Sequence, residues 1–156
     1  MQKLIRGLQQ FRTEVFKQQQ EFFEHLALGQ NPEALFITCS DSRIVPELLT
    51  QTEPGELFVL RNAGNLVPPY SAEFGGEAAT IEYAVKAIGV EQIVVCGHSH
   101  CGAVTGVLRP ELIRDLPAVE NWLTYADRVR QEIAERRVPR DPSDDLITAA
   151  VKSNVL

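Results

Sequence analysis

Two short segments of the chain concentrate side chains that can bind a metal ion and move protons. The first is CSDSR, residues 39–43, and the second is CGHSHCG, residues 96–102. Cys39 from the first segment, together with His98 and Cys101 from the second, offers the thiolate and imidazole ligands that zinc prefers. Structural zinc sites have four protein ligands, whereas catalytic sites keep one position open. Three protein ligands therefore predict a catalytic zinc site.

Two neighbouring side chains are weaker candidates for the same site. His100 could replace His98 as a ligand, but it directly precedes Cys101, which makes its reach awkward, so a surface histidine is the simpler interpretation. Cys96 lies inside the apolar run over residues 92–97 and is expected to be a core thiol, because free cysteines are among the most buried residues. The spacing of Cys96 and Cys101 is not that of a C-x-x-C motif, which disfavours a cysteine redox protein.

Asp41 and Arg43 add acid–base chemistry beside the first cysteine. Asp41 could bind the metal itself or accept a proton from a metal-bound water, and Arg43 could hold its carboxylate with two hydrogen bonds. Such a pair would keep Asp41 ionised, oriented and away from the metal, although a helix-capping turn is an alternative role. A zinc ion lowers the pKa of its bound water to about 7. Asp41 would then aim the resulting hydroxide at a small electrophile.

Strands that alternate with helices must position these two segments. Continuous apolar runs predict buried strands over residues 34–39, 56–62 and 92–97. Helices are expected over residues 44–50, 77–88, 101–108, 119–137 and from 144 onward. This alternation predicts an α/β fold with a mainly parallel sheet and helices on both faces. Because each chemical segment follows a strand, both are expected at the carboxyl ends of the strands.

An N-terminal helical arm precedes this core. Apolar residues recur at helical spacing over residues 2–28, which predicts an amphipathic helix or helix pair that ends at Gly29 and Pro32. We expect a single domain over residues 1–156, with the arm over 1–30 and the α/β core over 31–156. Since only three strands are clear, the sheet is expected to present a bare edge.

Composition and charge exclude several classes of protein. The chain has 156 residues, 44% of them hydrophobic, which is typical of a globular protein. A net charge of −6 without a basic cluster predicts no binding to nucleic acid. No apolar run is long enough to span a membrane, and the N-terminus is not a secretory signal, so a cytoplasmic protein without membrane contact is expected. Three cysteines then favour a metal site over a disulfide framework.

Four linked motifs give the chain a specific resemblance. CSDSR, EPGELFVLRNAGN, GGEAATIEYAV and CGHSHCGAV, in this order, resemble the β-class carbonic anhydrases. The resemblance implies reversible hydration of carbon dioxide to bicarbonate by a zinc-bound hydroxide, with one zinc ion per chain. It implies zinc ligands and an aspartate–arginine dyad at Cys39, His98, Cys101, Asp41 and Arg43. It also implies substrate contacts at Gln30, Phe58, Ala63, Tyr83 and Gly102.

The resemblance also bears on assembly and completeness. In the family the substrate pocket is shared across a dimer interface, so a homodimer or higher homo-oligomer is expected. Family members continue with a further strand and helix, which this chain is expected to lack. Because of this expected absence, one alternative stays open: a truncated, inactive interaction subunit, such as one in a bacterial microcompartment. A second alternative is that the same site acts on another electrophile, as a hydrolase of carbon disulfide or carbonyl sulfide.

Overall fold

The computed structural model describes residues 1–70, 75–135 and 145–156. The chain divides into two compact units, Met1–Asn31 and Pro32–Leu156. This boundary falls next to the expected limit between arm and core, while the expected single domain over 1–156 stays a prediction.

The first unit is the expected N-terminal helical arm. It comprises α1 (Gln2–Gln10), a π-helical turn η1 (Phe11–Val15), α2 (Phe16–Gln18) and α3 (Gln20–Leu26). Gln19 interrupts the helix because its φ of −118° and ψ of 29° depart from helical values. The ring of Phe23 lies 5.4 Å from that of Phe11 and 5.5 Å from that of Phe16, so aromatic contacts bridge the interruption. In the described parts of the chain, no helix combines the length and apolar character needed to cross a membrane.

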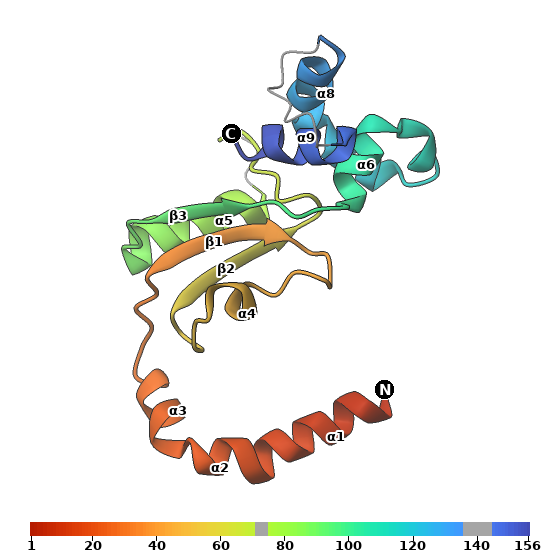
Figure 1. Ribbon diagram of the computed structural model, residues 1–156. Helices are drawn as coiled ribbons and strands as arrows, with labels where there is room; N and C mark the ends of the chain where they lie inside the picture. Colours follow the sequence, from red (N-terminus) through yellow and green to blue (C-terminus); the bar gives the residue numbers. More distant parts are fainter. Residues whose placement is uncertain (71–74, 136–144) are drawn as a thin grey trace. The chain divides into compact units, whose positions relative to one another are not determined.

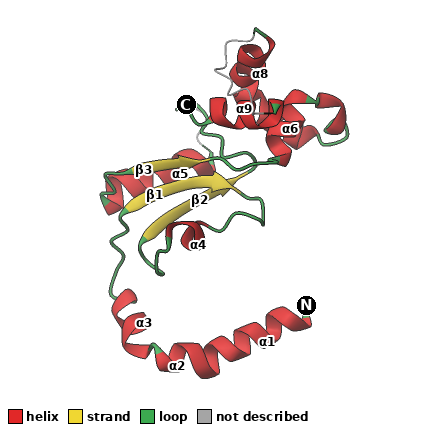
Figure 2. Cartoon of the chain, viewed as in Figure 1, coloured by secondary structure: helices red, strands yellow, loops and turns green. Residues whose placement is uncertain are grey.

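The second unit is built on a parallel sheet, as expected. Its strands are β1 (Ala34–Cys39), β2 (Leu57–Asn62) and β3 (Ile93–Cys96), in the order β2-β1-β3 (Figure 2). β1 pairs in parallel with both neighbours, and all of its residues are buried. The continuous apolar run that predicted β1 therefore corresponds to a strand surrounded on both edges and both faces.

Helices cover both faces of the sheet. The helix α4 (Pro46–Thr50) connects β1 to β2, and α5 (Gly76–Glu82) with the π-helical turn η2 (Tyr83–Ile88) connects β2 to β3. The first crossover runs from β1 outward to β2, and the second runs back from β2 past β1 to β3. Because the two crossovers run in opposite directions across the sheet, right-handed connections place α4 and α5 on opposite faces (Figure 1). One core cluster forms between the sheet and α5–η2, and it contains Leu35, Ile37, Leu60, Ala84 and Val90.

The described residues after β3 form short helices and the loops between them. These are α6 (Gly102–Leu108), η3 (Pro110–Leu112), α7 (Pro117–Leu123), η4 (Thr124–Ala126), α8 (Asp127–Ala134) and α9 (Leu146–Asn154). The expectation of one continuous helix over 119–137 is wrong, because the 3₁₀ turn η4 separates α7 from α8. The break lets Leu123, Ala126 and Val129 all be buried. The expected limits of these helices at Arg137 and Asp144 lie outside the described residues.

The burial expected for the third strand is also wrong. Ile93 is 51% exposed and Val94 41% exposed, although both belong to a continuous apolar run. The physical reason is that β3 is an edge strand: it pairs with β1 on one side, and no strand of the described residues pairs with its other side. Cys96, at its end, is half-buried and its thiol donates to the carbonyl of Gly97 at 3.4 Å.

The burial of the central strand β1 predicts where shortening a side chain lowers the free energy of unfolding most. Leu35→Ala removes a side chain that is 0% exposed in the core of the sheet, and it should lower the free energy of unfolding by about 3 kcal/mol. The control Leu112→Ala removes a side chain that is 60% exposed and should change it by less than about 0.5 kcal/mol. Urea denaturation followed by circular dichroism measures both. Equal losses in the two variants would contradict the assigned core.

Candidate metal centre

The pairing of β1 with β3 brings the two chemical segments together. Cys39 is the last residue of β1, and His98 follows the end of β3 by two residues. The two strands are parallel, with Thr38 opposite Cys96, so their carboxyl ends lie side by side. Cys101 immediately precedes α6. One ligand atom from each of Cys39, His98 and Cys101 lies within 4.8 Å of the other two.

The burial and spacing of these atoms fit a metal ion. Cys39 is 5% exposed and Cys101 is 0% exposed, and their Sγ atoms lie 3.9 Å apart. Zinc–sulfur bonds of about 2.3 Å at a tetrahedral angle hold two sulfurs about 3.8 Å apart. The Nε2 atom of His98 is buried and has no hydrogen-bond partner, which is costly unless a ligand occupies that direction. The donor set and the orphaned nitrogen together fit a zinc ion.

The two sulfurs share a proton unequally. The hydrogen bond from Cys101 holds the pKa of the Cys39 thiol far below its ordinary value, and the N–H of Gly64 lowers it further, against the effect of burial. The same sulfur–sulfur hydrogen bond raises the pKa of the Cys101 thiol, and burial of this thiol raises it further. One sulfur is thus a ready thiolate while the other retains its proton. A divalent cation would compete for that second proton, since metal binding deprotonates coordinating thiols.

The carboxylate of Asp41 is held by Arg43 through a two-pronged ion pair. Arg43 Nε donates to Asp41 Oδ1 at 2.9 Å, and Arg43 Nη2 donates to Oδ2 at 2.7 Å. The backbone N–H of Arg43 donates to Oδ1 as well. These hydrogen bonds hold the pKa of Asp41 well below its ordinary value. Asp41 Oδ2 also lies 3.9 Å from His98 Nε2, which places an ionised carboxylate beside the metal ligands.

Arg43 also connects the two chemical segments. Its Nη2 donates to the carbonyl oxygen of His100 at 2.9 Å. His100 has a φ of +56°, a left-handed conformation in which non-glycine residues are uncommon. Its side chain is exposed and is not one of the clustered ligands, so the structure favours His98 over His100 as the ligand.

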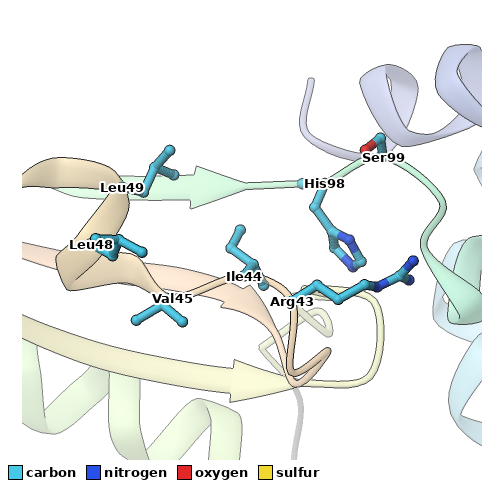
Figure 3. A pocket seen from close by; sticks show the side chains of 8 residues that line it. Arg43, Ile44, Val45, Leu48, Leu49, His98 and Ser99 are labelled. Carbon is cyan, nitrogen blue, oxygen red and sulfur yellow. The ribbon is translucent and has the colours of Figure 1, made fainter.

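A cavity of about 550 Å³ opens beside His98. Apolar side chains line one end and Arg43 and His98 the other, with the imidazole directed toward Arg43 (Figure 3). The lining residues come from the two segments that follow β1 and β3, and they are Arg43, Ile44, Val45, Leu48, Leu49, Gly97, His98 and Ser99. This space can admit a small apolar molecule next to the clustered ligands.

The residues expected to contact substrate do not all lie near the metal ligands. Ala63 and Gly102 do: Ala63 precedes Gly64, whose N–H reaches the Cys39 sulfur, and Gly102 follows Cys101. Phe58 lies opposite Leu35, four positions before Cys39, which is roughly 13 Å along the strand. Tyr83 packs on Phe58, with ring centroids 6.1 Å apart, so both belong to the opposite end of the sheet.

Gln30, the remaining expected contact, belongs to the other unit, Met1–Asn31. The roles of all five expected substrate contacts therefore stay predictions.

Arg61 is a residue of the candidate site that the sequence pattern did not predict. Its guanidinium donates to three backbone carbonyls of the Cys39–Ile44 segment: Cys39 at 3.0 Å, Asp41 at 2.7 Å and Ile44 at 3.0 Å. One side chain on β2 thus holds the backbone of a metal ligand and of the carboxylate beside it. The signal in the sequence was a lone arginine within an apolar strand, where a charge needs a specific partner.

The ion pair of Asp41 predicts a pH dependence. Arg43→Gln should raise the pKa of Asp41 toward its ordinary 3.8, because the charged hydrogen bonds are lost. In the parent, the stabilisation from this pair is complete above that pH and declines as the pH falls through the lower pKa of the folded state. A ¹³C titration of the Asp41 carboxyl group measures the shift. The control Arg130→Gln, which breaks the Asp127 pair instead, should leave Asp41 unchanged.

The three hydrogen bonds of Arg61 predict a role in metal binding. Arg61→Gln should weaken zinc affinity by about tenfold, the lower end of the range for residues that hold metal ligands in place. Competition with a chromophoric chelator measures the affinity. The exposed Arg114→Gln serves as a control with the same change in charge. If both variants bind zinc equally, the Arg61 hydrogen bonds do not position the site.

Comparison with known proteins agrees with this geometry. The family model described as carbonic anhydrase matches residues 34–156. The chain is 51% identical to the carbonic anhydrase of Synechococcus elongatus over 157 aligned residues, which cover 100% of this chain and 57% of that protein. It is 52% identical to the carbonic anhydrase of Pseudomonas aeruginosa over 130 residues, or 83% of this chain and 59% of that protein.

Solved structures show the same relationship. The β-carbonic anhydrase CcaA superposes with a TM-score of 0.91 at 49% identity, covering 99% of this chain and 75% of that one. One of the tetrameric β-carbonic anhydrases of Sordaria macrospora gives a TM-score of 0.80 at 32% identity, covering 98% of this chain and 75% of that one. The chain spans little more than half the length of the two curated carbonic anhydrases, from Synechococcus elongatus and Pseudomonas aeruginosa. With the family model, the sequence identity and the superposition in agreement, the chain belongs to the β-class carbonic anhydrases.

Proposed function

We propose that this protein catalyses the reversible hydration of carbon dioxide to bicarbonate with one zinc ion per chain. The observation that carries the proposal is the buried cluster of Cys39, His98 and Cys101 next to an ionised, arginine-held carboxylate. Three ligands leave one coordination position for a reactant, as in catalytic zinc sites. The apolar end of the neighbouring cavity suits a small, uncharged substrate.

In this proposal the residues of the site have different roles. When bound, zinc supplies a nucleophile by lowering the pKa of a coordinated water to about 7. Asp41 stays ionised at neutral pH, so Oδ2 can accept a hydrogen bond beside His98 and orient that nucleophile. Arg43 keeps the carboxylate in place and at the same time binds the backbone of the second chemical segment. Binding and orientation therefore depend on one connected set of hydrogen bonds.

A homo-oligomer is part of this proposal. Phe58 and Tyr83 lie too far along the sheet to line the metal site of their own chain. Ala63 and Gly102 lie beside the metal ligands of their own chain, so they can contact substrate there. If Phe58 and Tyr83 contact substrate as well, a second copy must present them, and Gln30 is proposed to contact substrate in the same assembly. The structures from Sordaria macrospora are described as tetrameric, which supports assembly of at least two copies.

A cytoplasmic location also belongs to the proposal. The three cysteines are free, and two of them are the proposed metal ligands, which a reducing compartment would keep available. Nothing in the described residues favours a microcompartment.

The alternative activities have less support. The relatives reported above are named carbonic anhydrases, which favours carbon dioxide over carbon disulfide or carbonyl sulfide as the substrate. The intact ligand cluster and the Asp41–Arg43 pair favour an active site over an inactive interaction subunit.

A pair of cysteine variants tests the proposed function. Cys39→Ser should abolish stoichiometric zinc binding and carbon dioxide hydration, because a hydroxyl is a poor zinc ligand. The control Cys96→Ser changes a half-buried thiol outside the cluster and should retain both. Metal analysis and stopped-flow hydration measure the two properties. Zinc binding without hydration in the parent would refute the activity, and a folded parent without zinc affinity would refute the site.

A further inference from the structure

A backbone peptide in the loop after β2 contacts a metal ligand directly. The N–H of Gly64 donates to the Sγ atom of Cys39 at 3.4 Å. This hydrogen bond belongs to the loop after β2, whose last residue, Asn62, lies opposite Cys39 in the sheet. Hydrogen bonds to metal-bound sulfur withdraw charge from it and orient it, so the direction of this N–H matters to the site.

The other side of the same peptide is held by a tryptophan. The peptide that contains the Gly64 N–H also contains the carbonyl of Ala63, and this carbonyl accepts a hydrogen bond from Trp122 Nε1 at 2.8 Å. The peptide group is planar, with its N–H and C=O pointing in opposite directions. Fixing the carbonyl therefore fixes the direction of the N–H. The indole and the sulfur lie at the two ends of one rigid unit.

We propose that Trp122 is a positioning residue for the metal ligand Cys39, acting through the Ala63–Gly64 peptide. The inference rests on the metal site of the proposed function, and it goes beyond that function in assigning a role to a side chain on α7. The indole N–H also polarises the peptide, because hydrogen bonds in a chain strengthen one another.

The remaining anchors of this loop act on other peptide groups. Asn154 on α9 donates to the carbonyl of Gly64 at 2.9 Å, which belongs to the next peptide. The side chain of Asn62 donates to the carbonyl of Leu66 and accepts from its N–H. These bonds keep the loop folded without contacting the Ala63–Gly64 peptide. Loss of the indole N–H should therefore free that peptide to rotate while the loop stays in place.

The absence of a side chain at Gly64 allows its peptide to approach the sulfur in a closely packed loop. Gly64 has a φ of +85°, and a Cβ atom at this position would lie 2.9 Å from the Cβ of Ala103. The loop therefore runs against α6, which begins directly after the ligand Cys101. A glycine at this position permits the contact between the peptide and Cys39, and Trp122 sets its angle.

The packing of Trp122 can be separated from its hydrogen bond. Its ring packs against a core cluster that includes Leu66 and Leu123, and it lies edge-on to Tyr125 with centroids 5.4 Å apart. An isostere that keeps the two fused rings but lacks the N–H would preserve these contacts. Trp122 is the only tryptophan of the chain, so replacement of every tryptophan changes this position alone.

The experiment uses the full chain produced in a tryptophan auxotroph supplied with β-(3-benzothienyl)alanine, in which sulfur replaces the indole N–H. Zinc affinity by chelator competition should fall by about tenfold, as expected for loss of a residue that orients a metal ligand. The thiolate-to-metal charge-transfer band of the Co²⁺-loaded protein should shift to lower energy, because the sulfur loses a hydrogen bond. Trp122→Phe should give the same two changes, and the control Tyr125→Phe neither.

The outcomes separate this inference from both a structural role and the proposed activity. Unchanged zinc affinity and an unchanged Co²⁺ band in the isostere would overturn it. A lower free energy of unfolding with the same Co²⁺ band would also overturn it, since that result describes packing alone. If the parent binds zinc but does not hydrate carbon dioxide, the proposed activity fails, while the affinity and the band still decide the role of Trp122.

Discussion

The parallel pairing of β1 with β3 is the constraint on which the rest of the site depends. It places the end of one strand, Cys39, beside the segment that carries His98 and Cys101. Neither strand could shift by one residue without turning the ligand side chains to the other face of the sheet. The fully buried β1 makes such a shift costly, because its apolar side chains would lose their core contacts. The stability of the sheet and the geometry of the ligands thus have the same origin.

Charge is the second organising factor. Two buried sulfurs lie in contact, and an ionised carboxylate lies next to the imidazole. Such a concentration of negative groups is unfavourable without compensation, which a divalent cation and the donors around it can supply. Arg43 neutralises Asp41, the N–H of Gly64 points at Cys39, and Arg61 holds the backbone between them. These donors come from β2 and from the loops that follow β1 and β2.

Much of the fold follows from local patterns along the chain. The apolar runs predicted three strands, and the helical spacing predicted the arm and the two crossover helices. The prediction failed where local pattern was insufficient. The run over β3 is as apolar as that of β1, and only its place at the edge of the sheet leaves Ile93 and Val94 exposed. The helix expected over 119–137 is divided by a turn that buries three of its apolar residues.

The sequence by itself was sufficient to predict a zinc site after two parallel strands: the types and spacing of Cys39, Asp41, His98 and Cys101 indicated it, and the structure brings these residues together. Tertiary structure decided which residues support them. Arg61 and Trp122 act through hydrogen bonds to backbone atoms as many as 59 positions away. Carbonyl and N–H groups are the same at every residue, so no sequence pattern marks which of them a distant side chain will reach. Only folding brings those partners within hydrogen-bonding distance.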